Sequence, residues 1–471
     1  MTNTNDTICA IATAPGGAIG TIRISGPEAI AITGRIFTPA NGKPLAERPP
    51  YTLTFGQIRS SEGAIIDEVL VSLFRGPHSY TGEDSTEISC HGSSYILQQV
   101  MQLLIQNGCR AALPGEYTQR AFLNGKMDLS QAEAVADLIA SISAATHRMA
   151  MNQMRGGFSR ELSALREQLL HLTSLMELEL DFSDHEELEF ADRTELEKIA
   201  RQIESVISHL VQTFSVGNAL KNGVPVAIVG ETNAGKSTLL NALLNEERAI
   251  VSDIHGTTRD VIEDTMNLGG ITFRFIDTAG IRETTDTIES LGIERSFQKL
   301  DQADIVLWVI DATQANEQYQ QLAEKILPRC EDKHLIIVLN KADLLDAANE
   351  DVQKRMLSVL ANQPQKTYVI TLSAKHKEGI TILQKKLVDF AALPDLSQND
   401  VVVSNIRHYE ALSHALESIH RVQDEMNMGL SGDFVSQDLR ECLFHLAEIT
   451  GGEITTDEVL GNIFRNFCVG K

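Results

Sequence analysis

The first quarter of the chain alternates apolar and polar residues with the short period of β-strands. We expect strands at residues 8–14, 20–25 and 85–92, and a further apolar run of strand character at 64–74. Residues 95–108 instead have the spacing of a helix and end in Asn-Gly, a common helix stop signal. These elements predict an α+β domain in the N-terminal region.

From Asp128 the apolar period becomes that of helices, and it continues with one interruption to about Leu220. The interruption is the stretch 177–189, which holds seven Asp and Glu residues and neither Lys nor Arg. We interpret it as a solvated acidic loop between helices, with a divalent-metal site as the alternative that its carboxylates allow.

Beyond residue 223, apolar runs of strand length alternate with helical stretches. This order predicts a mostly parallel sheet covered on both faces. The runs are Val224–Val229, Ile271–Ile276, 305–310, 335–339 and Thr367–Thr371. Helical spacing returns at about Val403 and continues to the end of the sequence. The simplest architecture is an α/β domain inserted into one helical domain, and two separate helical domains are the alternative.

Charge and composition narrow the classes of function. The 471 residues carry a formal net charge of −24. That charge argues against wrapping a nucleic acid over the whole surface, because phosphate contacts need Lys and Arg, although a local basic patch stays open. The six cysteines form no CxxC pair, so neither a zinc site nor a redox motif is predicted. No apolar run reaches the ~20 residues of a membrane span and the N-terminus lacks signal-peptide features, so we expect a cytoplasmic protein with no membrane partner.

The stretch GETNAGKST at 230–238 fits the P-loop pattern G-x-x-x-x-G-K-[ST], and it lies between a predicted strand and a predicted helix, as that motif requires. Gly230 and Gly235 permit the tight turn that points backbone N–H groups at a phosphate. Lys236 is expected to reach the β- and γ-phosphate oxygens, and Ser237 to bind Mg²⁺ through its hydroxyl.

Later motifs select the base and sense the γ-phosphate. Thr258 in GTTRD is expected to bind Mg²⁺ and the γ-phosphate, and DTAG at 277–280 to do the same through Asp277 and Gly280. Asp343 in NKAD can accept both N–H donors of guanine, which adenine lacks. The sequence therefore predicts a GTPase. The GTP contacts expected from these motifs and from the family resemblance that they carry are Asn233, Ala234, Gly235, Lys236, Ser237, Thr238, Ser252, Asp253, Ile254, His255, Gly256, Thr257, Thr258, Asp277, Thr278, Ala279, Gly280, Asn340, Lys341, Asp343, Ser373, Ala374 and Lys375.

The same motifs resemble those of a known family. With AIVSDIHGTTRD, DTAGIRETTDTIESLGIER and the terminal NFCVGK, the N-terminal segments TAPGGAIGTIRISG, YTGEDSTE and LPGEYTQRAFLNGKMDLSQAEAVADLI are similar to those of the MnmE (TrmE) family, GTPases of tRNA wobble-uridine modification. The resemblance extends from about Asp6 to Lys471 and rests on motifs in all three regions.

The resemblance implies a multidomain α+β architecture. An N-terminal domain (1–122) similar to tetrahydrofolate-binding folds would form a homodimer. A helical domain in two segments (123–222 and 393–471) would carry an inserted Ras-like G domain (223–392). The family acts on tRNA with the flavoprotein MnmG, in a heterotetramer-type complex. Together they add an aminomethyl or carboxymethylaminomethyl group to C5 of the wobble uridine, U34.

The stretch DTAGIRE at 277–283 lacks the Gln that orients the attacking water in signalling GTPases, because Ile281 occupies its position. The family resemblance implies two replacements. Glu289 would orient the water, beside Thr258 and Lys236 in the catalytic set, and a K⁺ ion would supply the charge of an arginine finger. Arg259 is interpreted as part of the switch rather than as such a finger. The implied K⁺ ligands are Asn233, Ser252, Ile254 and Thr257.

A tetrahydrofolate derivative, 5-formyl or methylene, is the remaining implied cofactor. Its glutamate tail would suit Lys or Arg, and its pterin N–H donors would suit a carboxylate. The implied contacts are Arg23, Glu87, Lys126 and Lys471. Cys468, in FCVGK, is interpreted as a small buried residue that anchors the tail rather than as a reactive thiol.

Two other functions remain open at this stage. One is a GTPase of the ribosome-assembly type, whose nucleotide state gates RNA binding; the N-terminal folate signature and FCVGK argue against it. The other is one-carbon transfer by this chain alone, which the absence of any flavin or nicotinamide fingerprint in the sequence disfavours.

Overall fold

The structure is a computed structural model. It describes residues 6–14, 16–181, 193–231, 233–245, 264–276, 300–345, 367–391, 401–430 and 432–452, together with Phe464, Phe467 and Gly470. The chain forms two compact units. The first comprises residues 1–140, 150–209 and 407–471, and the second comprises 141–149 and 210–406.

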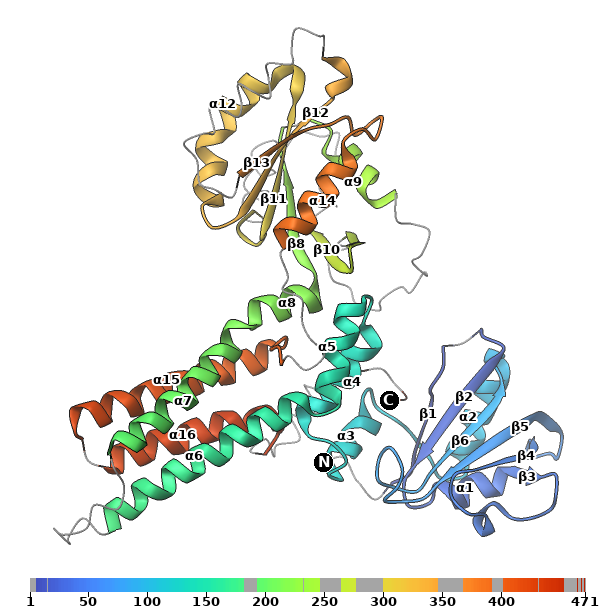
Figure 1. The fold of residues 1–471 in the computed structure, drawn as a ribbon. Helices are drawn as coiled ribbons and strands as arrows, with labels where there is room; N and C mark the ends of the chain where they lie inside the picture. The colour runs from blue at the N-terminus through green and yellow to red at the C-terminus, as the bar shows by residue number, and fades with distance from the viewer. Residues whose placement is uncertain are drawn as a thin grey trace. The chain divides into compact units, whose positions relative to one another are not determined.

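The N-terminal part of the first unit is a seven-stranded sheet in the order β3-β4-β5-β6-β2-β1-β7 (Figure 1). The β1–β7 pair is parallel and the other pairs are antiparallel. The strands are β1 Ile8–Ile11, β2 Ile19–Ser25, β3 Phe37–Pro39, β4 Thr52–Arg59, β5 Ile65–Phe74, β6 Ser85–His91 and β7 Arg110–Ala111.

Helices α1 (Ala29–Ile36) and α2 (Ser94–Gln106) pack on one face of this sheet and share a core with it. A short 3₁₀ turn, η1 (Leu45–Glu47), adds Leu45 to that core. The predicted α+β character is confirmed, and the strand expected at 8–14 is shorter. The sequence did not predict β4, because it buries Thr54 while Leu53 and Phe55 face outward, the reverse of an ordinary amphipathic strand.

Helices from both ends of the sequence pack together in the first unit. Helix α6 lies along α16, and α16 also contacts α4. The two flanks therefore form one discontinuous helical domain, as expected. These helices are α3 Glu116–Leu123, α4 Leu129–Ala140, α6 Gly157–Asp181, α7 Arg193–Gln212, α15 Ile406–Met428 and α16 Gly432–Thr450, and α5 Ala144–Met154 lies between α4 and α6.

The helical stretch after Asp128 has more interruptions than the sequence predicted. Helix α4 ends before Ile142, which is 65% exposed. Ser143 and Thr146 then cap α5 reciprocally, because each backbone N–H donates to the other's hydroxyl at 3.1 Å. Gly156, with φ +75°, separates α5 from α6. The acidic stretch expected as a loop falls largely on residues outside the described ranges.

A buried ion cluster joins α4 to α15. Both Glu133 oxygens bind the Arg407 guanidinium at 3.0 Å, and Oε2 also lies 2.6 Å from His408 Nε2. Arg407 donates further to the carbonyl oxygens of Glu448 and Ile449, at the end of α16. One carboxylate and one guanidinium thus hold α4 against α15 and α16, two consecutive helices that lie far from α4 in sequence.

The second unit contains a six-stranded sheet in the order β13-β12-β11-β8-β10-β9. All neighbours are parallel except β9 and β10, so the predicted mostly parallel sheet is confirmed and β9 is an unpredicted antiparallel edge. The strands are β8 Val224–Val229, β9 Asp264–Leu268, β10 Ile271–Ile276, β11 Ile305–Asp311, β12 His334–Asn340 and β13 Thr367–Thr371.

Both faces of this sheet are covered, which is why its central strands read as continuous apolar runs. One core includes residues of α9 and α14, and the other includes α12. The helical elements are α8 Phe214–Asn222, α9 Lys236–Asn245, α12 Ala315–Ile326 and α14 Ile380–Ala391, with 3₁₀ turns η2 Ala312–Gln314, η3 Leu327–Cys330 and η4 Ala342–Leu344.

The segments that lead into and out of this α/β fold touch each other. The Val403 N–H donates to the Thr213 hydroxyl at 3.1 Å. A Cβ at Gly217 would lie 2.1 Å from the Val403 carbonyl oxygen, so only glycine permits this approach. The inserted domain is therefore closed at its base by its own two connections.

We expect Glu133→Gln to loosen the helical domain without unfolding the α/β fold. Removing one partner of a buried ion cluster typically costs about 3–5 kcal/mol. Trp308, the only Trp of the sequence, is fully buried in β11 and reports the α/β fold alone. Hydrogen exchange in α4, α15 and α16 should accelerate, while the Trp308 fluorescence transition stays at its wild-type denaturant concentration.

The same cluster predicts a pH dependence. Burial opposes ionisation of Glu133, yet the hydrogen bonds and charges of His408 and Arg407 outweigh it and lower its pKa to about 2. A depressed pKa stabilises the fold above the ordinary Glu pKa of about 4.3, and that stabilisation is lost as the pH falls toward 2. Protection of α4 should therefore fall over this window in the wild type and in the control Glu417→Gln, whose side chain is 69% exposed, but not in Glu133→Gln. A wild-type profile shared by Glu133→Gln would contradict the assignment.

Candidate functional site

The P-loop turn forms between β8 and α9, where the sequence predicted it. Gly230 has φ +147° and Gly235 has φ +94°. A Cβ at Gly230 would lie 2.1 Å from the Val309 carbonyl oxygen, and one at Gly235 would lie 2.2 Å from Asn340 Nδ2. Both glycines are therefore required by close approach as well as by their backbone angles. Asn233, a residue other than glycine, also has a left-handed φ of +66°.

Lys236 begins α9 and folds back over the turn. Its Nζ donates to the carbonyl oxygens of Gly230 at 2.8 Å and Glu231 at 2.7 Å. Burial lowers the pKa of this ammonium, and the charge of Glu231 partly opposes that shift. Ser237 and Thr238 follow in the first turn of α9, where backbone N–H groups and the helix dipole favour an anion.

The base-selecting motifs meet at the ends of β12 and β13. Asn340 donates from Nδ2 to the Ala234 carbonyl at 2.9 Å and accepts the Ala374 N–H at 3.0 Å, so it ties the P-loop to the SAK loop. The Ser373 hydroxyl donates to Asp343 Oδ1 at 2.6 Å, and this bond is the main cause of a lowered Asp343 pKa. Lys375 follows Ala374 in the same loop.

Asp311, at the end of β11, belongs to this constellation although the sequence analysis missed it. Its Oδ2 lies 2.6 Å from Lys341 Nζ, and its Oδ1 accepts the Thr313 N–H. Lys341 has φ +63°, so the pair fixes a strained turn directly before Asp343. An Asp at the end of an apolar strand run was the signal available in the sequence.

Several predicted residues lie outside the described ranges, and their placement stays a prediction. They are Ser252, Asp253, Ile254, His255, Gly256, Thr257, Thr258, Asp277, Thr278, Ala279, Gly280, Glu289, Cys468 and Lys471.

A second group of predicted residues gathers on the N-terminal sheet. Arg23 on β2 and Glu87 on β6 are directly paired across the strands. The Arg23 Nε and Nη2 atoms each lie 2.8 Å from Glu87 Oε1. Arg23 Nη1 donates to the Gly470 carbonyl oxygen at 3.2 Å, which brings the C-terminal segment to this ion pair.

Two glycines allow the C-terminal segment to dock. A Cβ at Gly470, which has φ +94°, would lie 2.8 Å from the Ile11 carbonyl oxygen. A Cβ at Gly115 would lie 2.8 Å from the Phe464 carbonyl oxygen. Phe464 itself is buried against Leu129 and neighbours in the helical domain. Close backbone approaches at Phe464 and at Gly470 therefore position both ends of this segment.

The loop 75–84, which joins β5 to β6, is held by hydrogen bonds to residues after α3 and on β2. Lys126 Nζ donates to the Pro77 carbonyl at 2.8 Å, and Asn124 Nδ2 donates to the Thr81 carbonyl at 2.7 Å. Thr81 and Ser25 share a buried hydroxyl–hydroxyl bond of 2.7 Å. Lys126 is thus attached to the backbone of this loop rather than to the side chain of Arg23 or Glu87.

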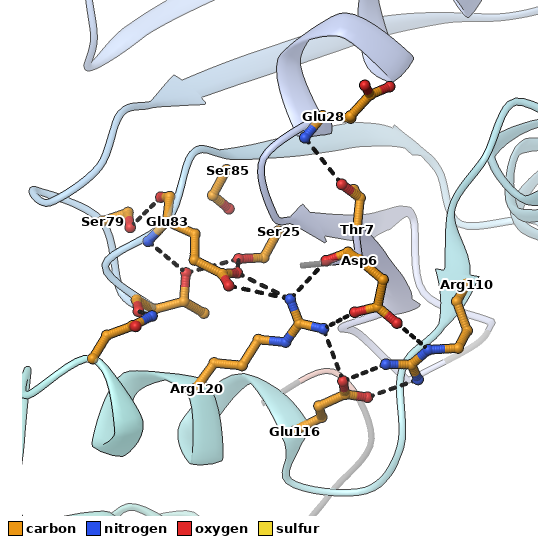
Figure 2. A network of polar contacts seen from close by, with 12 residues as sticks. Asp6, Thr7, Ser25, Glu28, Ser79, Glu83, Ser85, Arg110, Glu116 and Arg120 are labelled. Carbon is orange, nitrogen blue, oxygen red and sulfur yellow. Dashed lines mark hydrogen bonds and ion pairs between the residues drawn. The ribbon is translucent and has the colours of Figure 1, made fainter. Parts of the chain in front are cut away.

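Figure 2 shows the charged network that anchors this loop from below. Arg120 on α3 is almost fully buried and binds Asp6, Glu116 and Glu83. Arg110 binds Glu116 at 2.6 Å from the other side. Burial opposes ionisation of Asp6 and Glu116, but the two guanidinium groups lower both carboxyl pKa values. This network is not predictable from the sequence, because each of its residues alone resembles a surface charge.

The part of the chain that the structure describes contains no further candidate site for a metal ion or a reactive thiol. Among these residues no group of three or more His, Cys, Asp or Glu is placed to hold a metal ion. Five cysteines are free and buried, and burial raises the Cys442 pKa to about 12, which suits an inert thiol. No helix within the described ranges is long and apolar enough to cross a membrane.

Comparison with known proteins covers almost the whole chain. The model of the MnmE helical domain matches residues 129–468, and that of the GTP-binding protein TrmE N-terminus matches residues 7–126. Among solved structures, an Era variant from Aquifex aeolicus bound to GDP and AlF₄⁻ is 29% identical, covering 41% of this chain and 66% of that chain with a TM-score of 0.28.

Curated relatives match from end to end. The tRNA modification GTPase MnmE of Bacteroides thetaiotaomicron is 70% identical over 469 residues, which is 99% of each chain. The protein of the same name from Christiangramia forsetii is 52% identical over 476 residues, again 99% of each. With its P-loop and its guanine-selecting motifs assembled at one sheet edge, the chain belongs to the MnmE family of tRNA modification GTPases.

Proposed function

We propose that this protein is a potassium-activated GTPase that acts with the flavoprotein MnmG on tRNA. Together they add an aminomethyl or carboxymethylaminomethyl group to C5 of the wobble uridine U34, and GTP hydrolysis with pairing of G domains drives the conformational cycle. The observation that carries the GTPase part is the joint placement of the P-loop, Asn340, Asp343 and Ser373 at one sheet edge. The tRNA and MnmG parts rest on family membership.

Guanine selectivity follows from the setting of Asp343. The Ser373 hydroxyl occupies one oxygen, and His376 Nε2 lies 3.6 Å from the other. These contacts orient a carboxylate with lone pairs to spare, and a carboxylate can accept two parallel N–H donors. Guanine offers such a pair and adenine does not, so Asp343 is the residue that selects guanine over adenine in binding.

Asp343→Asn should convert the preference from guanine to xanthine nucleotides. The amide presents an N–H donor where the carboxylate accepted, so it suits the extra carbonyl of xanthine. GTP affinity should fall by roughly two orders of magnitude, the cost of two charge-assisted hydrogen bonds. Titration with fluorescent GTP and XTP analogues measures the change, and Asp332→Asn, in an exposed turn before β12, is the matched control. Unchanged GTP affinity in Asp343→Asn would remove the base-selecting role.

Hydrolysis without the usual Gln is assigned to residues of this chain. Lys236 stabilises the β- and γ-phosphate oxygens, Thr258 contacts the γ-phosphate, and Glu289 orients the attacking water. Mg²⁺ is held by Ser237 and Thr258, and K⁺ by Asn233, Ser252, Ile254 and Thr257. A bound K⁺ would supply positive charge next to the phosphates. The left-handed backbone of Asn233 supports this role, since such an exposed, strained conformation is typical of functional turns.

Steady-state GTP hydrolysis should be much faster in KCl than in NaCl at equal ionic strength. Asn233→Ala should remove most of that difference, with a loss of about 10²-fold in KCl, the usual effect of deleting one charge-stabilising group. Asn222→Ala, on the exposed end of α8, keeps the wild-type response and serves as the control. Equal wild-type rates in the two salts would refute the potassium assignment and favour a partner-activated switch.

A tetrahydrofolate derivative, 5-formyl or methylene, is assigned to Arg23, Glu87, Lys126 and Lys471. The first two form a half-buried ion pair, with side chains 20% and 27% exposed, so a ligand can reach both. A carboxylate for pterin N–H donors and cations for a glutamate tail fit this ligand class. Because the sequence has no flavin or nicotinamide fingerprint, the redox steps are assigned to MnmG.

Exposed apolar residues on the N-terminal sheet support the formation of a homodimer through this domain. They lie on the face opposite the core that the sheet shares with α1 and α2. Phe55 on β4 is 50% exposed and lies directly opposite Leu70 on β5, which is 39% exposed. Leu53, 60% exposed, lies beside them. Cross-strand pairing continues from Leu53 through Ser72 to Glu87, so this apolar patch adjoins the Arg23–Glu87 pair on the same face. We assign the patch to a second copy of the chain.

Phe55→Glu should therefore convert the dimer to a monomer at micromolar concentration, because it places an unpaired charge in an apolar interface. Light scattering coupled to gel filtration measures the mass. Ile105→Glu, on α2 and 47% exposed, is the matched control and should remain dimeric. A Phe55→Glu variant that keeps the wild-type dimer mass would exclude this patch.

A further inference from the structure

The Arg23 guanidinium contacts two tyrosine rings. Its guanidinium carbon is 5.7 Å from the ring centroid of Tyr80 and 5.7 Å from that of Tyr117. Distances below about 6 Å are those of attractive cation–π contacts. The guanidinium is thus confined by the rings while Glu87 and the Gly470 carbonyl bind its N–H groups.

The two rings are held differently. Tyr117 is fully buried on α3, and its hydroxyl donates to the Arg23 carbonyl oxygen at 2.7 Å. Tyr80 is 37% exposed and comes from the loop 75–84. Its hydroxyl lies 2.9 Å from the hydroxyl of Thr118, which is fully buried on α3. One ring therefore belongs to the core, and the other reaches Arg23 from a surface loop.

The loop that carries Tyr80 is fixed at several points. Thr81 binds Ser25, Asn124 binds the Thr81 carbonyl, and Glu83 binds the buried Arg120 at 3.2 Å (Figure 2). These three contacts hold the loop immediately after its exposed aromatic residue, Tyr80. They fix the ring in a defined place beside the Arg23–Glu87 pair.

We propose that Tyr80 is a positioning residue of the folate site, whose ring holds the Arg23 guanidinium in the orientation that binds the ligand. The inference rests on the proposed folate site and deepens it. Without the Tyr80 ring, Arg23 keeps its partners Glu87 and Gly470. It loses a contact that disfavours alternative rotamers of its side chain. Ligand binding must then also restrict the Arg23 side chain, and the lost side-chain entropy weakens the affinity.

The test measures the affinity of the full-length protein for 5-formyltetrahydrofolate by isothermal titration calorimetry. Tyr80→Leu should bind about tenfold more weakly, within the range of a cation–π contact. Tyr80→Phe retains the ring and should bind within about threefold of the wild type, since it loses only the hydroxyl bond to Thr118. Equal losses in the Leu and Phe variants would show that the ring over Arg23 is irrelevant and overturn the proposal.

A double-mutant cycle separates positioning from general loop damage. In an Arg23→Gln background, Tyr80→Leu should have almost no further effect on affinity, because the cation that it positions is gone. The same tenfold loss in both backgrounds would refute action through Arg23. If Arg23→Gln binds too weakly to measure, the comparison of the Leu and Phe variants decides alone.

Two controls keep the outcomes distinct. GTP hydrolysis should be unchanged in every Tyr80 variant, because the nucleotide site belongs to the other compact unit. A wild-type protein that does not bind 5-formyltetrahydrofolate would overturn the proposed folate function itself. Wild-type binding with an unaffected Tyr80→Leu variant would overturn only the inference about Tyr80.

Discussion

The structure depends on closing a helical domain whose two segments are interrupted by a whole α/β fold. Glu133 accomplishes much of this closure, since it binds Arg407 and His408 across more than half of the sequence. A buried carboxylate is costly without a partner, and the Arg407 guanidinium supplies the permanent positive charge that offsets this cost. An apolar contact could hold the helices equally well, but it would fix their register less sharply than directional bonds to two adjacent residues of α15. Arg407 of α15 in turn binds carbonyl oxygens in the last turn of α16.

The C-terminal segment links the packing of the helical domain to the Arg23–Glu87 pair on the N-terminal sheet. Phe464 docks against α4, and Gly470 reaches the end of β1, where only glycine fits. The carbonyl of Gly470 then binds Arg23. A residue next to the end of the sequence thus contributes to a site built on the second strand. The C-terminal end therefore supports the N-terminal site through a backbone carbonyl rather than through a charged side chain.

The sequence predicted where the P-loop and the base-selecting motifs lie in the fold, because these motifs are local. Gly230, Lys236 and Asp343 each follow a strand that reads as an apolar run, so order along the chain sufficed to bring them to one sheet edge. It failed for β4, whose outward Leu53 and Phe55 invert the usual pattern. It also failed for Tyr80 and Arg120, because their roles arise from partners that no local period reveals. Long-range polar contacts are the part of a fold that periodicity does not encode.

The two candidate sites orient a cationic side chain toward an anionic ligand in the same way. In each, backbone carbonyl oxygens bind the cation: Gly230 and Glu231 for Lys236, and Gly470 for Arg23. A carbonyl dipole orients the charge without neutralising it, whereas a carboxylate alone would compete with the ligand. Arg23 does have such a carboxylate, Glu87, and both of its bonds fall on the single oxygen Oε1. A monodentate contact of this kind leaves the second oxygen of Glu87 available to accept an N–H donor of a ligand.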